Sequence, residues 1–291
     1  MQKGKPWLFY AVITTIFWGF WGALMEIPEK NGFPPTLGYS VWALTMIIPS
    51  MVSLALIRWK LDWNKKSIFL GSVIGLTGAG GQLILFQALK YGPAYLVFPF
   101  ISLSPVVTII LSAIFLRERA SFRGWTGIIL ALLAIPLLSY QSARNGNQEN
   151  YYWIILSLLI FLAWGFQAYV MKLANETMTA ESIFFYMMAT GIILIPVAIG
   201  MTDFNQVINW GIGGPWLTAI IQVLNAIGAL MLVYAFRYGK AIIVSPMTNA
   251  LAPVITIIIS LSLYRVIPHI IIIIGIIFAV VSAFLLAIEG E

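Results

Sequence analysis

The sequence contains no cysteine, one histidine and few charged residues. Only 9% of its 291 residues are Asp, Glu, Lys or Arg, whereas a soluble domain carries about a quarter. The lack of cysteine excludes disulfides, thiolate metal sites and thiol catalysis. Because 61% of the residues are hydrophobic, the chain could not cover its surface with polar groups in water. The composition therefore indicates a protein whose solvent is lipid.

Long apolar runs are abundant, and ten of them approach the roughly 20 residues needed to cross a bilayer. They are residues 7–27, 36–57, 68–89, 94–116, 124–140, 151–171, 182–201, 214–236, 241–263 and 268–288. These runs do not alternate like barrel strands, and backbone polar groups must be satisfied within the bilayer. We therefore predict an all-α membrane protein with ten transmembrane helices, the first being too long for a signal-peptide core.

The basic residues lie in short connections between the apolar runs, so the net charge of +6 does not indicate nucleic-acid binding. If the N-terminus is inside, twelve Lys and Arg residues fall on the inner side and four on the outer side. Positive charge is retained on the cytoplasmic side of membrane proteins. We therefore expect a multi-pass protein of the cell (inner) membrane with both termini in the cytoplasm.

The two halves of the chain resemble each other at offsets of 146 to 148 residues. The matches are Trp18-Gly19-Phe20 with Trp164-Gly165-Phe166, Pro49 with Pro196, Tyr91-Gly92 with Tyr238-Gly239, Pro99 with Pro246, and Pro105-Val106-Val107-Thr108 with Pro253-Val254-Ile255-Thr256. We predict five-helix repeats at residues 1–140 and 151–291, joined by a polar outer linker at 141–150. Because five is odd, the second repeat would be inverted, as in many secondary transporters.

A recognisable motif follows the third run of the first repeat. Residues 90–119 read KYGPAYLVFPFISLSPVVTIILSAIFLRER, and Trp125-Thr126-Gly127 opens the next run. This pattern resembles the EamA family of the drug/metabolite transporter superfamily, with Glu118 at the family's acidic position. The resemblance implies ten helices, cytoplasmic termini and transport of metabolites or drugs, often outward. The second repeat departs from the pattern, because Tyr264-Arg265-Val266 stands where the acidic residue would be.

Polar and aromatic side chains inside the apolar runs are the candidate substrate-binding groups, because an amide facing lipid is costly. These candidates are Trp18, Trp21, Gln82, Gln87, Ser102, Trp164, Gln167, Gln222, Asn225, Tyr234 and Asn249. The resemblance implies that the first, third and fourth helices of each repeat line the cavity. Hydrogen bonding between helices, and plain packing for the tryptophans, are the alternative interpretations. The prolines of the fourth and ninth runs, including Pro99 and Pro246, could act as hinges, although a fixed kink is the favoured interpretation.

Glu26 is the one acidic or basic residue inside a predicted span, near its outer end. A carboxylate within a membrane is usually functional, so Glu26 is a candidate for coupling transport to protons. The alternative is a carboxylate at the outer interface, beside Glu29 and Lys30.

We therefore expect a secondary transporter, with export favoured, that moves a small metabolite, amino acid-like or amphipathic cationic solute by alternating access. The sequence shows no nucleotide-binding motif, and we expect no cofactor and no metal. A lipid flippase or scramblase is the main alternative. A membrane-embedded enzyme is less favoured, because one histidine and one intramembrane carboxylate offer little chemistry. The internal duplication is compatible with a working monomer, and a homodimer stays open.

Overall fold

The computed structural model describes residues 5–91, 97, 100–138, 140, 152–264 and 269–289, and the described part is helical throughout its regular elements. The predicted linker 141–150 and Pro99 lie outside the described residues. The elements of the first half are α1 (Pro6–Leu24), α2 (Glu26–Lys30), α3 (Pro35–Thr45), α4 (Ile47–Leu56), α5 (Lys65–Tyr91), α7 (Pro105–Phe115) and α8 (Phe122–Leu138).

The second half has a similar order of long helices, although α2 has no counterpart in it. It contains α9 (Tyr152–Ala174), α10 (Ala180–Ile193), α11 (Ile195–Gly200), the π-helical turn η1 (Ile212–Trp216), α12 (Leu217–Tyr238), α13 (Ala241–Tyr264) and α14 (Ile270–Glu289). Both halves have a break in their second span. Pro49 follows the break between α3 and α4, and Pro196 follows the break between α10 and α11. Proline cannot donate the backbone hydrogen bond of a continuous helix, which accounts for the two breaks.

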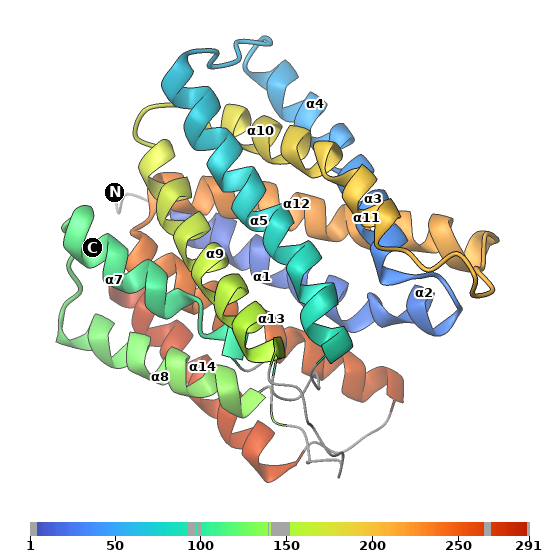
Figure 1. The fold of residues 1–291 in the computed structure, drawn as a ribbon. Helices are drawn as coiled ribbons and strands as arrows, with labels where there is room; N and C mark the ends of the chain where they lie inside the picture. Colours follow the sequence, from blue (N-terminus) through green and yellow to red (C-terminus); the bar gives the residue numbers. More distant parts are fainter. Residues whose placement is uncertain are drawn as a thin grey trace.

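The helices of the two halves pack in a reciprocal pattern (Figure 1). Helix α1 packs against α12 and α13 of the second half, and α9 packs against α5 and α7 of the first half. Helices α8 and α14, the last of each half, pack against each other. Each half therefore completes the core of the other, and a cavity between the halves is bordered by α1 on one side and α9 on the other.

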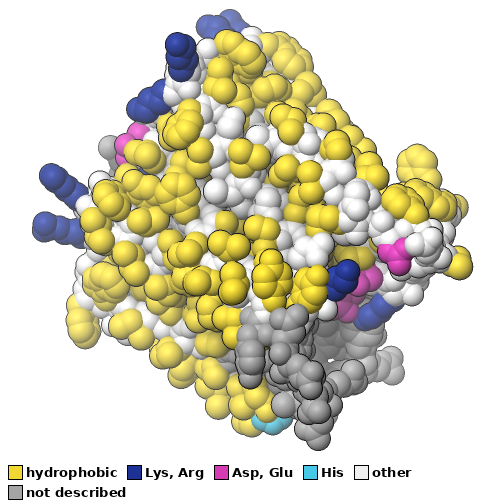
Figure 2. All heavy atoms as spheres, in the orientation of Figure 1, with side chains coloured by type: hydrophobic (Ala, Val, Ile, Leu, Met, Phe, Trp, Pro, Cys, Tyr) yellow, Lys and Arg dark blue, Asp and Glu magenta, His cyan; other side chains and the backbone are white. Residues whose placement is uncertain are grey.

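Large apolar side chains cover much of the outer surface, and Figure 2 shows them over one broad face, with Lys and Arg at its upper and left edges. Eight helices in the described residues are long and apolar enough to cross a membrane. Two shorter apolar helices, Phe100–Phe115 and Phe122–Leu138, lie within the fourth and fifth predicted spans. The chain is a multi-pass membrane protein, and the exact number of ten spans stays a prediction.

The two ends of the helix bundle differ in their contacts. At one end, which we call the basic end, Lys172 donates from Nζ to the Gly239 carbonyl at 2.7 Å, and Arg237 donates to the Met178 carbonyl at 3.4 Å. At the opposite end, which we call the α2 end, the Gly32 carbonyl accepts from the Asn209 backbone N–H at 3.0 Å. The basic end is the one that the charge bias predicts to be cytoplasmic.

A candidate solute cavity between the two halves

The main scaffold of the cavity is a pair of matching tryptophan contacts. Trp18 on α1 donates from Nε1 to the Asn225 carbonyl at 3.4 Å, and Trp164 on α9 donates to the Gly78 carbonyl at 3.3 Å. Each indole also lies where a side chain on the facing helix would be, against Gly228 and Gly81 respectively. Both glycines are needed for close approach, because a Cβ at either position would overlap the ring. The indoles thus fix the spacing of α1–α12 and of α9–α5.

A second matching pair involves threonines of the fourth span in each half. Thr108 Oγ1 donates to the Gly165 carbonyl, and Thr256 Oγ1 donates to the Gly19 carbonyl, both at 3.0 Å. These bonds join α7 to α9 and α13 to α1 at the level of the tryptophans. Helical carbonyls have spare acceptor capacity, so hydroxyl groups can bond to them without breaking the helix.

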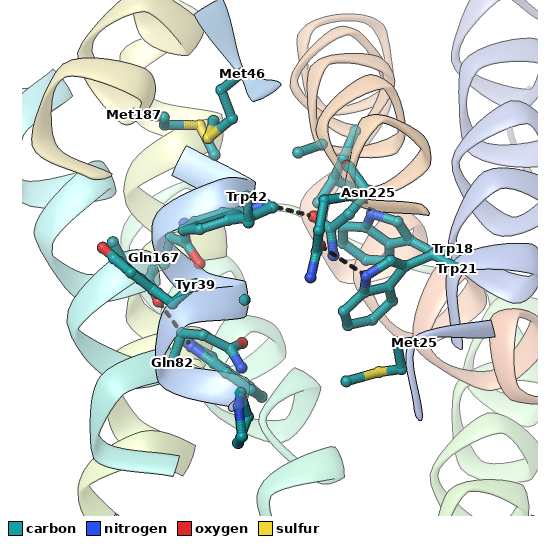
Figure 3. Close-up of a pocket in the computed structure, with 18 of the residues that line it drawn as sticks. Trp18, Trp21, Met25, Tyr39, Trp42, Met46, Gln82, Gln167, Met187 and Asn225 are labelled. Atoms are coloured by element: carbon teal, nitrogen blue, oxygen red, sulfur yellow. Dashed lines mark hydrogen bonds between the residues drawn. The ribbon is translucent and has the colours of Figure 1, made fainter. Parts of the chain in front are cut away.

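Between these contacts lies a cavity of about 340 Å³, a volume typical of small-molecule sites. Its tryptophans come from α1, α3 and α9, and its amides come from α5, α9, α12 and α13. Figure 3 shows Gln82 and Gln167 on one side, Asn225 with Trp18 and Trp21 on the other, and Trp42 reaching across between them. The cavity is therefore apolar in its walls and carries a few convergent amide groups.

Eight of the eleven candidate residues line the cavity. They are Trp18, Trp21, Gln82, Trp164, Gln167, Gln222, Asn225 and Asn249. Gln87 and Ser102 are partly buried outside the lining. Tyr234 is also outside it, because its hydroxyl donates to Glu181 Oε1 at 2.5 Å near the basic end and its ring stacks on Tyr10.

The lining also includes residues that the sequence interpretation left out. Helix α3 contributes Tyr39 and Trp42, although the resemblance implied a lining from the first, third and fourth helices of each half. Trp42 donates from Nε1 to Asn225 Oδ1 at 3.0 Å, which ties α3 to α12 across the cavity. The signal that could have found Trp42 is a tryptophan near the middle of a span, the same signal that identified Trp18.

The two ends of the cavity have different linings. Toward the basic end the lining residues Met46, Met171 and Phe236 are almost fully buried. At the α2 end the lining includes Glu29, which is exposed, together with Phe33. The exposed lining residues, Glu29 and Pro35, lie at the α2 end, and apolar side chains close the cavity at the basic end.

Beyond these apolar residues, polar contacts join the two halves at the basic end. The Glu118 carboxylate accepts from the Ile242 backbone N–H at 3.0 Å, at the start of α13. Burial raises the pKa of the Glu118 carboxyl, although the backbone bonds from Ile242 and Ala241 and the charges of Lys172 and Lys240 oppose that shift. The acidic residue of the family motif thus lies against the first turn of a helix in the other half, where the helix dipole favours a negative charge.

Glu26 lies outside the cavity lining, on the exposed side of α2. Its carboxylate forms an ion pair with Lys30 at 2.8 Å, one helical turn away. This arrangement matches the alternative of an interfacial carboxylate, and coupling through Glu26 stays a prediction. Within the described ranges, no group of three or more His, Asp or Glu side chains lies close enough together to hold a metal ion.

Comparisons with known proteins agree with this architecture. An uncharacterized transporter of Archaeoglobus fulgidus is 30% identical over 139 residues, covering 47% of this chain and 48% of the relative. The chain thus spans about half the length of that relative. An uncharacterized protein of Methanocaldococcus jannaschii is 28% identical over 44% of this chain and 92% of its own length.

A third relative, from Hamiltonella defensa, is named "Probable 4-amino-4-deoxy-L-arabinose-phosphoundecaprenol flippase subunit ArnE" and is 33% identical over 28% of this chain and 72% of its own length. One crystal structure has the same fold, with a TM-score of 0.77 and 18% identity over 96% of this chain and 98% of that one. The model of the EamA-like transporter family matches residues 5–140 and again residues 151–288. The chain therefore belongs to the EamA-like transporter family.

Proposed function

We propose that the chain is a secondary transporter that moves a small solute through the cavity between two inverted five-helix repeats, residues 1–140 and 151–291. The observation that carries this proposal is the reciprocal pair of tryptophan contacts, Trp18 with α12 and Trp164 with α5, on either side of one cavity. Equivalent halves that exchange equivalent contacts can adopt two packings of similar energy, which alternating access requires.

The described conformation supports an outward-facing state, if the basic end is cytoplasmic. The exposed lining residue Glu29 lies at the α2 end, and Met46 and Phe236 close the cavity toward the basic end. An inward-facing state would then require the contact between Glu118 and α13 to open. One chain supplies the whole cavity lining, so we propose that a monomer is sufficient for transport. The family resemblance favours export, and protons remain the candidate coupling ion.

Transport is tested with the purified protein in proteoliposomes. Uptake and counterflow of amino acids, nucleosides, carboxylates and quaternary amines would be measured with and without a pH gradient. Trp42→Ala, which removes a lining ring, should abolish transport of any solute that the wild type moves. Trp125→Ala, at an exposed ring on α8 outside the cavity lining, is the matched control and should retain it. Absence of transport for every solute, or equal activity of the two variants, would count against the proposal.

The inverted arrangement has its own test, which the cysteine-free sequence makes simple. Lys60→Cys and Asn205→Cys place single thiols at exposed positions in equivalent parts of the two repeats. In intact cells an impermeant maleimide should label the thiol at 205 and should label the thiol at 60 only after permeabilisation. Labelling of both from the same side would contradict inversion of the repeats.

A lipid flippase is the second candidate function, because a relative named as a flippase subunit matches part of the chain. Dithionite reduction of fluorescent lipids in the same proteoliposomes separates the two candidates. A transporter for soluble solutes should leave one leaflet protected. Loss of that protection with the wild type, and its return with Trp42→Ala, would favour the flippase.

A further inference from the structure

Two amide side chains on α12 are held in a single orientation by tryptophans from other helices. Trp42 donates to Asn225 Oδ1 at 3.0 Å, and Trp21 donates to Gln222 Oε1 at 2.9 Å. An indole N–H can only donate, so it can bond only to the oxygen of each amide. Each amide oxygen is therefore turned toward an indole, and each amide NH₂ group keeps both of its hydrogens for another partner.

The two NH₂ groups lie on the same face of α12. Gln222 and Asn225 are three residues apart, about 60° around a helix, and both line the cavity. Among the described residues, neither NH₂ group donates a hydrogen bond to the protein. We call this pair, Gln222 Nε2 and Asn225 Nδ2, the donor wall (Figure 3 labels Asn225, Trp21 and Trp42). Because its oxygens are turned toward the indoles and its NH₂ groups are unpaired, the donor wall favours a ligand that supplies oxygen lone pairs.

The rest of the lining does not offer an equally fixed alternative for such a ligand. The described lining contains no Lys or Arg, and its one charged side chain is Glu29 at the α2 end. Asn249 is held the opposite way, because its Nδ2 donates to the Ser245 carbonyl at 2.9 Å, and its Oδ1 has no hydrogen bond within the described residues. The amides of Gln82 and Gln167 have no hydrogen bond within the described residues and can turn to suit a ligand.

We propose that the donor wall binds an oxygen acceptor of the transported solute, a carboxylate or a carbonyl, while an apolar body packs against Trp18 and Trp21. This inference rests on the proposed function and adds to it the class of solute. Trp42 and Trp21 are positioning residues, because they turn the amides so that only donors face the ligand. An ammonium group finds no acceptor on this wall, so an amine of the same shape binds more weakly.

The test uses three probes that share one apolar body and differ in the polar end. Hydrocinnamate carries a carboxylate, hydrocinnamamide a neutral carbonyl and phenylpropylamine an ammonium group. Their binding to the purified protein is measured by isothermal titration calorimetry. The wild type should bind one or both oxygen-bearing probes roughly tenfold or more tightly than the amine. Comparison of the two oxygen-bearing probes then shows whether the ligand group is charged or neutral.

Asn225→Asp is the decisive variant, because it keeps an oxygen for the Trp42 indole and replaces the NH₂ donor by an anionic oxygen. Affinity for hydrocinnamate should fall roughly tenfold or more, and affinity for phenylpropylamine should rise. A gain of amine binding cannot result from misfolding. Asn249→Asp is the matched control, since it adds the same charge at a lining residue whose amide oxygen is already the unpaired end, and it should change the preference less.

Trp42→Phe tests the positioning role separately from the loss of a ring. The variant keeps an aromatic side chain but loses the N–H, so the Asn225 amide can turn and present either end. The preference for oxygen-bearing probes over the amine should shrink toward equality, while apolar packing is retained. A variant that weakens all three probes by the same factor would show that Trp42 contributes packing alone and would overturn its positioning role.

Other outcomes overturn the donor wall itself. These are tightest binding of the amine to the wild type, no binding of either oxygen-bearing probe, or equal effects of Asn225→Asp and Asn249→Asp. They are distinguishable from failure of the proposed function. If a solute is transported but the acid-to-amine preference is unchanged in Asn225→Asp, the donor wall is wrong and transport stands. If the carboxylate binds as expected but no solute is moved, the donor wall is supported and the proposed transport function is wrong.

Discussion

The two halves of the molecule share two matching pairs of contacts with each other but differ in the side chains that they place in the cavity. Trp18 and Trp164 make the same bond to a carbonyl of the opposite half, and Thr256 and Thr108 do the same for the neighbouring helices. The side chains on the same stretches of α12 and α5 differ. Positions 222 and 225 of α12 carry the amides Gln222 and Asn225, whereas the equivalent positions of α5, offset by 147, carry Gly75 and Gly78.

This difference teaches that the halves share a packing scaffold, while the paired amides of α12 have no counterpart at the equivalent positions of α5. Gly75 and Gly78 leave space that is filled from other helices, by Thr190 and by the amide of Gln167. Trp42 has no aromatic counterpart, since residue 189 is an alanine. A duplicated scaffold of this kind is compatible with two packings of similar energy, as the proposed function requires.

The largest effect should come from breaking the shared scaffold. Gly81→Leu and Gly228→Leu each place a side chain inside the indole of Trp164 or Trp18. We expect each variant to lose about 1–3 kcal/mol or more, because a tryptophan ring packed between helices cannot move aside easily. The measurement is the thermal unfolding midpoint in detergent.

The adjacent residue supplies the control for this prediction. Gly80 lies on the same helix, and a Cβ added there meets no atom within 4 Å. Gly80→Leu should therefore keep the wild-type midpoint. If Gly81→Leu and Gly80→Leu unfold at the same temperature, the indole contact does not set the helix spacing. Strongly unequal losses for Gly81→Leu and Gly228→Leu would show that the two halves do not share this contact equally.

A smaller difference in stability is expected between alanine variants of Gly75 and Gly78, the glycines of α5 at the positions equivalent to Gln222 and Asn225. A Cβ at Gly75 would lie 2.8 Å from Thr190 Cβ and 3.0 Å from the Tyr186 carbonyl, whereas a Cβ at Gly78 meets the mobile end of Gln167. Gly75→Ala should therefore lose about 1–3 kcal/mol, and Gly78→Ala about 0.5 kcal/mol or less, by the cost of overpacking. Thermal midpoints of the two variants decide this, and a reversed order would contradict the difference in their surroundings.

The threonine bonds should give a still smaller and balanced effect. Valine matches the shape of threonine but cannot donate, so Thr108→Val and Thr256→Val should each lose about 1 kcal/mol. Chemical denaturation in mixed micelles measures both variants under one condition. Equal losses would show that the threonine bond contributes the same stability in both halves. Destabilisation of only one variant would show that the bond matters in one half alone.

Much of the fold could be predicted from the sequence, because long apolar runs and the repeated motifs report on the bilayer and on duplication. The prediction of which polar residues in one run line the cavity was less accurate, and helix geometry explains why. Gln82 and Gln87 are five residues apart, about 140° around the helix, so both cannot face one cavity. Asn225 and Tyr234 are nine residues apart, about 180°, and Tyr234 accordingly bonds Glu181 outside the lining.

The position of Trp42 within a span could have marked it as a candidate, but its partner could not be derived from that span alone. Nothing in the run 36–57 indicates which face meets the other half, because apolar residues surround the helix on all sides. The partner of Trp42 is Asn225, 183 residues further along the chain, so the contact depends on how the two halves are packed. Long-range packing of this kind is not encoded in the periodicity of one helix.

The smallest effect concerns Glu118, a one-sided contact at the basic end. The second half has Tyr264-Arg265-Val266 at the equivalent place in the sequence and so has no carboxylate there, whereas Glu118 of the first half reaches the start of α13. Burial raises the pKa of Glu118 above its usual 4.5 in the folded protein. A raised carboxyl pKa means that the folded state binds the proton more tightly than the unfolded chain does. The stability contributed by protonation is therefore complete below pH 4.5 and is lost as the pH rises through the folded-state pKa.

Glu118→Gln removes this titration while keeping an oxygen that can accept from the Ile242 N–H. Thermal midpoints of wild type and variant would be followed from about pH 4.5 to neutral pH. We expect the wild type to lose stability relative to Glu118→Gln as the pH rises across this window, because its buried carboxylate becomes charged. Parallel curves would show that Glu118 has the same proton affinity in both states. A wild type that gains stability over the variant with rising pH would show that the charges of Lys172 and Lys240, together with the start of α13, outweigh burial.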